Sequence, residues 1–280
     1  AELAGHLVVD AQREHEDQAL HACGLHGGDD GLGLPVQVFA REVGVDDVLP
    51  SHGAFQQLLV QHVADHDLGV GRLVAGEFLR VAQQQGLALA GDPDIRQTLL
   101  LRDPKKLTGS EPANATIVIG NVLDKKLLKN ALAGQDVVYA NLAGEDLDKQ
   151  AQAVIAAMQS EGVKRLVFVL SLGIYDEIPG KFGEWNDAII GEDLKRYRRA
   201  ADVIEASGLD YTILRPAWLM DDDEVDYELT PKGSPFKGTV VSRKSVGELI
   251  AKVIASPELH VGANLGVNKP NTDGDKPYFM

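Results

Sequence analysis

Residues 163–173, which read Val-Lys-Arg-Leu-Val-Phe-Val-Leu-Ser-Leu-Gly, give the clearest indication of the fold. The run Arg165–Leu170 is apolar throughout after its arginine, which is typical of a parallel strand that is buried on both faces. The small residues Ser171 and Gly173 then mark the point at which the chain leaves the strand. In parallel sheets the ligand lies outside the carboxyl ends of the strands, so the residues directly after each strand are the candidate site.

The segments around this strand alternate between strand and helix patterns. Short apolar or β-branched runs predict further strands at Thr98–Leu101, Ala115–Ile119, Asp136–Ala140 and Tyr211–Leu214. Apolar periodicity and capping residues predict helices at about Asp124–Ala133, Leu147–Glu161, Asp193–Ser207 and Ser245–Ala255. Such alternation with short links predicts the α/β class, with a doubly wound, Rossmann-like parallel sheet over residues 95–280.

Residues 1–94 differ in composition from the rest of the chain. They contain no Lys, Ile, Asn, Thr, Tyr, Trp or Met, and they hold seven of the eight histidines. Strands favour several of the missing residue types, so an ordinary sheet is not expected there. Three interpretations stay open: a foreign or misread stretch, a disordered extension, or an unusual small domain. The segment could also hold a degenerate first strand–turn–helix unit of the following domain.

Charge and composition narrow the classes of partner. The net charge of −15 argues against a nucleic-acid-binding surface, which needs clustered Lys and Arg. The single cysteine, Cys23, cannot form an internal disulfide, so we expect a reducing, cytoplasmic location. The chain has no apolar run long enough to cross a membrane, and its first residues lack the features of a signal peptide. The spacing of the histidines fits no metal motif, so no metal site is expected.

Four phrases at the expected strand ends resemble the atypical short-chain dehydrogenase/reductases, including their NmrA-like and flavin/biliverdin-reductase-like branches. They are Leu101–Leu107, Gly120–Asp124, Val163–Gly173 and Ala206–Pro216, and they occur in family order. The resemblance implies an NAD(P)-binding Rossmann domain. It also implies a small-molecule substrate, whereas it gives no oligomeric state.

The resemblance implies which residues hold the cofactor. Arg102 matches the position that binds the adenosine 2′-phosphate, which favours NADP(H) over NAD(H) because a guanidinium donates paired hydrogen bonds to such a dianion. A solvated arginine before a turn is the alternative. Asn121 and Val122 match the pair at the adenine, where the family's usual Asp is Asn in this chain. Beside the ribose the matches are Ala140, Asn141 and Leu142. At the nicotinamide end the matches are Ser171, Leu172 and Gly173 beside its ribose, and Pro216, Ala217 and Trp218 as a lid over the ring.

The chain departs from the family at the pyrophosphate site. The family opens with a strand, a Gly-rich turn and a helix, and no clean copy of this unit precedes residue 95. The nearest candidate is Gly69–Gly76 with Glu77–Ala82, in which four residues rather than two follow the Gly-x-Gly. Val60–Asp67 is too polar for a buried central strand. Without a substitute, we expect the sheet to lack its central strand.

A second departure concerns catalysis. The family's better-known members use a Tyr and a Lys four residues later as a proton-transfer pair, but the matching positions hold Asp193 and Tyr197. The remaining candidate acids are Ser171 and Tyr175. Tyr175 could face the nicotinamide, or it could be a packed loop aromatic, and both interpretations stay open.

The expected substrate segments contain Trp185, Trp218 and the acidic run Asp221–Glu224. The aromatic rings could stack on a planar ligand, whereas the acidic run is more simply a solvated loop. We therefore weigh three functions. The chain is an NADPH-dependent reductase of a small carbonyl, quinone or flavin-like acceptor, or a non-catalytic NADP(H)-sensing regulator of the NmrA-like type, or an inactive copy.

Overall fold

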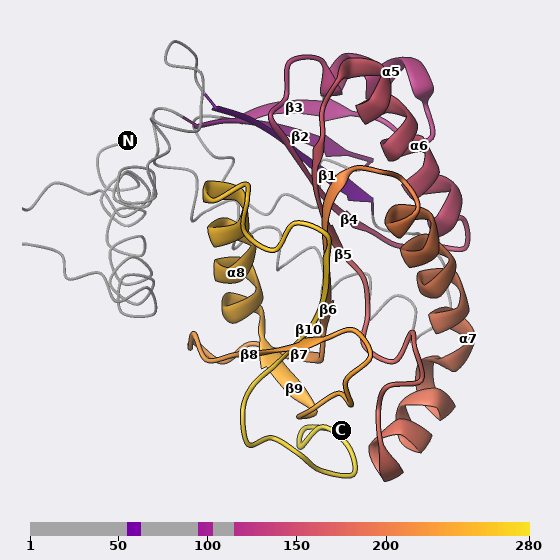
Figure 1. Cartoon of the computed structure of the whole chain (residues 1–280), viewed down its shortest axis with the longest axis vertical. Coiled ribbons are helices and arrows are strands. Elements are labelled where there is room, and N and C mark those ends of the chain that lie inside the picture. The colour runs from indigo at the N-terminus through magenta and orange to yellow at the C-terminus, as the bar shows by residue number, and fades with distance from the viewer. Residues whose placement is uncertain (1–54, 63–94, 103–114) are drawn as a thin grey trace, which may run out of the picture.

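The computed structural model describes residues 55–62, 95–102 and 115–280, and these form a Rossmann-like α/β fold around one twisted sheet (Figure 1). The sheet has the strand order β3-β2-β1-β4-β5-β6-β10-β8 and is parallel except for β8. Its strands are β1 (Phe55–His62), β2 (Ile95–Leu101), β3 (Ala115–Ile119), β4 (Val137–Leu142), β5 (Arg165–Val169), β6 (Asp210–Pro216), β8 (Glu228–Pro231) and β10 (Ala263–Asn268). The predicted fold class is confirmed.

Helices cover both faces of this sheet. α5 (Lys125–Leu132), α6 (Leu147–Glu161) and α7 (Gly180–Glu205) lie on one face, and α8 (Arg243–Ala255) lies on the other (Figure 1). A small parallel pair, β7 (Trp218–Met220) and β9 (Val240–Ser242), extends the domain beyond the end of β6. The order of the strands reverses between β1 and β4, which is where open sheets of this kind bind ligands.

β1 is an inner strand between β2 and β4, and it comes from the segment that sequence analysis left unassigned. Leu59 of β1 pairs with Leu99 of β2 on one side and with Tyr139 of β4 on the other. The expectation that the sheet lacks its central strand was therefore wrong. The polar stretch Val60–Asp67 was misleading because the strand lies earlier, on Phe55–His62. The candidate Gly-rich turn and helix at Gly69–Ala82 lie outside the described residues.

The buried strands and helix faces follow the apolar patterns in the sequence. All residues of β4 and β5 are buried, as expected for strands that are covered on both sides. Helix α6 has the predicted bounds and ends at Gly162, whose φ of 76° suits glycine. Helix α7, in contrast, begins at Gly180 and not near Asp193.

The longer α7 has a physical reason in its first turns. Phe182, Asn186 and Ile190 recur every four residues and are all buried, so they form one inward face of the helix. Gly183, which would normally weaken a helix, is required there because a Cβ would lie 2.3 Å from the carbonyl oxygen of Ile178.

A buried ion pair fastens the loop after β5 to the neighbouring strands. The guanidinium of Arg215 on β6 contacts the carboxylate of Glu177, and their side chains are 0% and 5% exposed. The same carboxylate accepts hydrogen bonds from the backbone N–H groups of Gly173 (3.0 Å) and Tyr175 (2.8 Å). Arg215 also donates through Nε to Asn264 Oδ1 on β10 (2.8 Å). Burial lowers the pKa of Arg215, and the nearby Glu177 opposes this shift.

The ion pair predicts a large loss of stability when one partner is neutralised. Glu177→Gln leaves the buried guanidinium of Arg215 without its counter-charge, so we expect the free energy of unfolding to fall by about 3 kcal/mol or more in urea titrations. The control is Asp148→Asn, which breaks the exposed pair between Arg199 and Asp148, with side chains 54% and 24% exposed. It should change the stability by less than about 1 kcal/mol. Equal losses in the two variants would contradict the role of the Arg215–Glu177 pair.

Candidate functional site

The predicted cofactor residues lie along one edge of the sheet. The register pairs Gln61 near the end of β1 with both Leu101 of β2 and Asn141 of β4. Asn141 in turn pairs with Val169 of β5, and Val169 pairs with Leu214 of β6. The carboxyl ends of these strands therefore meet at a common edge. At this edge Arg102 lies after β2 and Ser171 lies after β5, where the sequence placed them. Pro216, the last residue of β6, lies at the same edge.

The family resemblance assigns the adenosine to the ends of β2 and β3, and this part of the edge is called the adenosine side below. Arg102 is half-buried directly after β2, and the N–H of Gly120 bonds the carbonyl of Leu101 (2.9 Å), which joins the two strand ends. The exposed Asn121 forms a local turn in which its Oδ1 accepts from the N–H of Leu123 (2.9 Å). An aspartate would accept the same bond, so this turn tolerates the change from the family's usual Asp. Val122 is buried beneath it.

The family resemblance assigns the nicotinamide to the ends of β5 and β6, and this part of the edge is called the nicotinamide side below. Ser171 and Leu172 are buried directly after β5, and the N–H of Leu172 bonds the carbonyl of Pro216 (3.3 Å). Gly173 has a φ of 83°, and a Cβ there would lie 2.9 Å from Nδ2 of Asn186. Only glycine fits this position. The structure therefore brings the segments 171–173 and 216–218 together.

The ribose segment between these two sides is the end of β4. Ala140, Asn141 and Leu142 are all buried there. The donor set of the whole edge comprises a guanidinium, amides, a hydroxyl and backbone N–H groups between apolar side chains. Such a set fits the adenosine and nicotinamide ends of a dinucleotide. The candidate segment for the pyrophosphate, Gly69–Ala82, lies outside the described residues.

The contacts of Tyr175 favour the packed aromatic over the catalytic acid. Its hydroxyl donates to Glu205 Oε1 (3.2 Å) and accepts from Asn264 Nδ2 (2.7 Å). Glu205 is the last residue of α7 and Asn264 the second residue of β10, so the hydroxyl points away from the carboxyl edge. Burial and the negative charge of Glu205 raise the pKa of Tyr175. Three cations lie 4.3–5.4 Å from its ring centroid: Arg198, Arg215 and Lys232.

Asp193 and Tyr197, which occupy the positions of the family's proton-transfer pair, have structural contacts in this chain. Tyr197 lies on the buried face of α7, and burial raises its pKa. Asp193 pairs with Arg196 across one turn of the helix (3.0 Å). Ser171 is therefore the candidate acid that remains at the carboxyl edge.

Three aromatic rings, those of Phe182, Trp185 and Trp218, pack in a row beside the nicotinamide side. The rings of Phe182 and Trp185 stack with centroids 6.1 Å apart, and Trp185 meets Trp218 at 5.0 Å with a tilt of 57°. Phe182 and Trp218 are buried, whereas Trp185 is half-buried. The indole N–H of Trp218 donates to Asn186 Oδ1 (3.0 Å). Sequence analysis missed Asn186, although the four-residue spacing of Phe182, Asn186 and Ile190 was a signal for a buried position.

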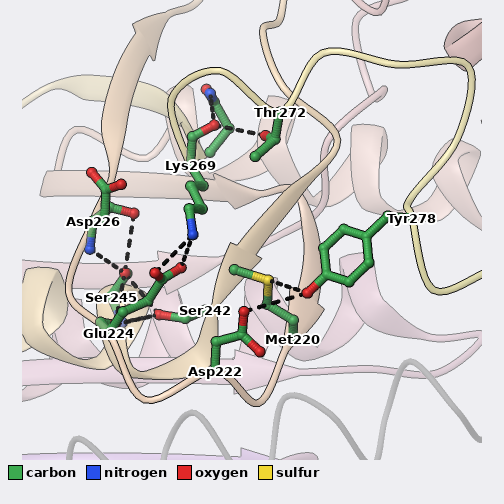
Figure 2. Close-up of polar contacts among 10 residues, drawn as sticks. Met220, Asp222, Glu224, Asp226, Ser242, Ser245, Lys269, Thr272 and Tyr278 are labelled. Atoms are coloured by element: carbon green, nitrogen blue, oxygen red, sulfur yellow. Dashed lines mark hydrogen bonds and ion pairs between the residues drawn. The ribbon is translucent and has the colours of Figure 1, made fainter.

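The acidic run after β7 is more than a solvated loop. Asp221, Asp223 and Glu224 are exposed or half-buried, and each pairs with a cation at 2.6 Å: Arg243, Lys244 and Lys269, respectively. Figure 2 shows Lys269 reaching both carboxylate oxygens of Glu224, beside the serines that begin α8. Arg243 and Lys244 are buried. The pairs with Arg243 and Lys244 hold the segment after β7 against the first turn of α8, and the pair with Lys269 holds it against the end of β10.

The hydroxyls that begin α8 strengthen the same connection. Ser242, the N-cap of α8, donates from Oγ to the carbonyl of Glu224 (2.7 Å) and accepts from the N–H of Ser245 (2.9 Å). The hydroxyl of Tyr278 contacts Met220 Sδ (3.2 Å) and Asp222 Oδ2 (3.4 Å) in the same cluster (Figure 2). Three separate segments, around Met220–Glu224, Ser242–Ser245 and Tyr278, are therefore hydrogen-bonded to one another.

The described residues offer neither a metal site nor a membrane-spanning helix. Among residues 55–62, 95–102 and 115–280, no group of His, Cys, Asp and Glu side chains is arranged to hold a metal ion. In the same part of the chain, no helix has the length and apolar character needed to cross a membrane.

Comparison with known proteins agrees with this geometry. Residues 80–257 match the NAD(P)H-binding family. A Rossmann-fold NAD(P)-binding family protein from Shigella flexneri is 49% identical, with a TM-score of 0.64, over 81% of this chain and all of the other.

Two more distant structures share the fold. A short-chain dehydrogenase/reductase from Veillonella parvula, solved in complex with NADP, is 24% identical with a TM-score of 0.63, covering 80% of this chain and 99% of its own. ChuY, an anaerobillin reductase from Escherichia coli O157:H7, is 20% identical with a TM-score of 0.57, covering 78% and 99%. Since the family match spans more than half of the sequence and the strand ends have the corresponding arrangement, this chain belongs to the NAD(P)H-binding family of Rossmann-fold proteins.

Proposed function

We propose that this chain is a reductase that uses NADPH in preference to NADH and reduces a small carbonyl, quinone or flavin-like acceptor. The observation that carries the proposal is that Arg102, Ser171 and Trp218 follow the carboxyl ends of β2, β5 and β6 at one edge of the sheet, with Trp185 packed against Trp218. Such an edge offers a cation for a phosphate, a hydroxyl for a developing negative charge and aromatic rings for a planar acceptor. The reductase from Escherichia coli with the same fold supports the reaction class.

The proposal assigns the two ends of the cofactor to the two sides of the edge. Arg102 binds the adenosine 2′-phosphate, and Asn121 with Val122 lines the adenine. Asn141 and its neighbours line the ribose. When bound, the nicotinamide supplies a hydride. The residues of the chain orient the cofactor and exclude water from its reacting end.

We assign to Ser171 the role of hydrogen-bond donor to the acceptor. Its hydroxyl is buried directly after β5, next to the segment that bonds the Pro216 carbonyl through Leu172. A hydroxyl there can donate a hydrogen bond to an acceptor oxygen as negative charge develops on it. Because the family's two proton-transfer positions hold Asp193 and Tyr197 in place of a Tyr/Lys pair, acceptors that need weak acid assistance, such as quinones and flavins, fit this site best.

The second candidate function is a non-catalytic NADP(H)-sensing regulator. The observation in its favour is the replacement of the proton-transfer pair by Asp193, which is ion-paired, and Tyr197, which is buried. The two functions share the cofactor site and differ in turnover. A chain that binds NADPH without oxidising it in the presence of any acceptor would favour the regulator.

The cofactor preference predicts a selective effect at Arg102. In calorimetric titrations, Arg102→Ala should weaken NADPH binding by roughly 10- to 100-fold, the value of one charged hydrogen-bonding contact, and leave NADH binding within about twofold. Arg96→Ala is the matched control, because this exposed arginine lies at the other end of β2. If Arg102→Ala weakens both cofactors equally, Arg102 does not read the 2′-phosphate.

The reductase proposal predicts different effects at the two candidate acids. With NADPH and menadione, a small quinone, Ser171→Ala should lower kcat by about 10- to 100-fold, as expected for loss of a positioned proton donor. Tyr175→Phe should keep kcat within about twofold and lower the free energy of unfolding by about 1 kcal/mol, because only its two hydrogen bonds are lost. A large fall in kcat for Tyr175→Phe, with Ser171→Ala unaffected, would reverse the assignment.

A further inference from the structure

We propose that Asn186 is a positioning residue, which fixes the indole ring of Trp218 at the nicotinamide side of the cofactor site. The inference rests on the proposed function, because the nicotinamide side is defined by it. Asn186 lies in the second turn of α7 and is 0% exposed. No part of it reaches solvent, so it acts on a ligand through its neighbours.

The carboxamide oxygen of Asn186 orients the indole. It accepts the N–H of Trp218 at 3.0 Å, and both groups are buried. An indole carries one donor and no acceptor, so this single bond sets the direction of its N–H edge. Trp218 also contacts Trp185 at 5.0 Å, so a rotation of its ring would disturb the half-buried surface that borders the site.

Among the described residues, the amide nitrogen of Asn186, Nδ2, does not contribute a hydrogen bond that would stabilise the fold. Within the described part of the chain, Nδ2 of Asn186 is buried and has no hydrogen-bond partner. It lies against Gly173, where a Cβ would come within 2.9 Å of it. A buried donor without a partner destabilises a fold, so an apolar residue would suit the core better. A local conflict of this kind is expected at functional positions.

The contacts of Asn186 join three segments of the nicotinamide side. Gly173 belongs to the loop after β5, Trp218 to the segment after β6, and Asn186 to the helix between them. A change at Asn186 should therefore alter the binding of the acceptor, which meets the indole surface. It should not alter the adenosine end at Arg102, which follows β2.

A double-mutant cycle tests whether Asn186 acts through Trp218. In the unmodified background, Asn186→Leu should raise the KM for menadione about tenfold and leave kcat within about twofold, because loss of one hydrogen bond of about 1.4 kcal/mol misplaces the indole. In the Trp218→Phe background, Asn186→Leu should leave the KM unchanged. It should also keep or raise the melting temperature there, because it removes a buried amide that has no bonding partner left.

The matched control is Gln135→Leu. Gln135 is another buried amide with one bonded end, to Thr98 Oγ1 at 3.2 Å, and one unpartnered oxygen, and it follows α5 rather than lining the nicotinamide side. The KM of the Gln135→Leu variant for menadione should equal that of the unmodified protein. An unchanged KM for Asn186→Leu in the unmodified background, or an equal rise in both backgrounds, would overturn the proposal.

An NMR readout without cofactor separates this inference from the proposed function. The chain has two tryptophans, so the indole N–H signal of Trp218 is identified by its absence in Trp218→Phe. In Asn186→Leu this signal should move upfield and exchange faster with water, and a signal unchanged from the unmodified protein would overturn the anchoring. If the unmodified chain reduces no acceptor, the proposed function fails, whereas the NMR signal still decides the role of Asn186.

Discussion

The buried ion pair between Arg215 and Glu177 is the constraint on which the nicotinamide side depends. One carboxylate collects the guanidinium and the N–H groups of Gly173 and Tyr175, so the loop after β5 has a single conformation that satisfies its buried donors. The carbonyl of Glu177 also accepts the N–H of Phe236 (2.8 Å), which ties the segment before β9 to the same loop. Ser171, at the start of this loop, is held at the carboxyl edge as a consequence.

The same pair explains why Tyr175 is packed. Its backbone is fixed by Glu177, and its ring then lies among cations that Glu205 and other carboxylates balance. Lys232 at the ring and Asn264 at the hydroxyl are distant in sequence, because they lie beside β8 and on β10. Sequence reasoning therefore left two roles open for Tyr175, and the long-range contacts favour one of them.

Local patterns predicted the regular elements well, because their information is local. Ala115–Ile119 and Leu147–Glu161 have the predicted bounds, since a β-branched run and a helix ended by Gly162 need no distant partner. The strand Phe55–His62 was missed because its pairing with β2 and β4 outweighs the unusual composition around it. Sequence analysis did not predict the first turns of α7, in which close packing against Ile178 requires Gly183. The meeting of the strand ends was predictable because parallel strands share one carboxyl edge, whereas the cofactor roles of the residues there stay predictions.

If this carboxyl edge binds NAD(P)H, NADPH should change the hydrogen–deuterium exchange of the full chain at that edge. We expect NADPH to slow exchange at the strand-end segments 120–123, 141–143, 171–173 and 216–218. Exchange at the opposite edge, in segments 162–164 and 207–209, should stay unchanged. Protection confined to that opposite edge, or no protection at saturating NADPH, would contradict the account.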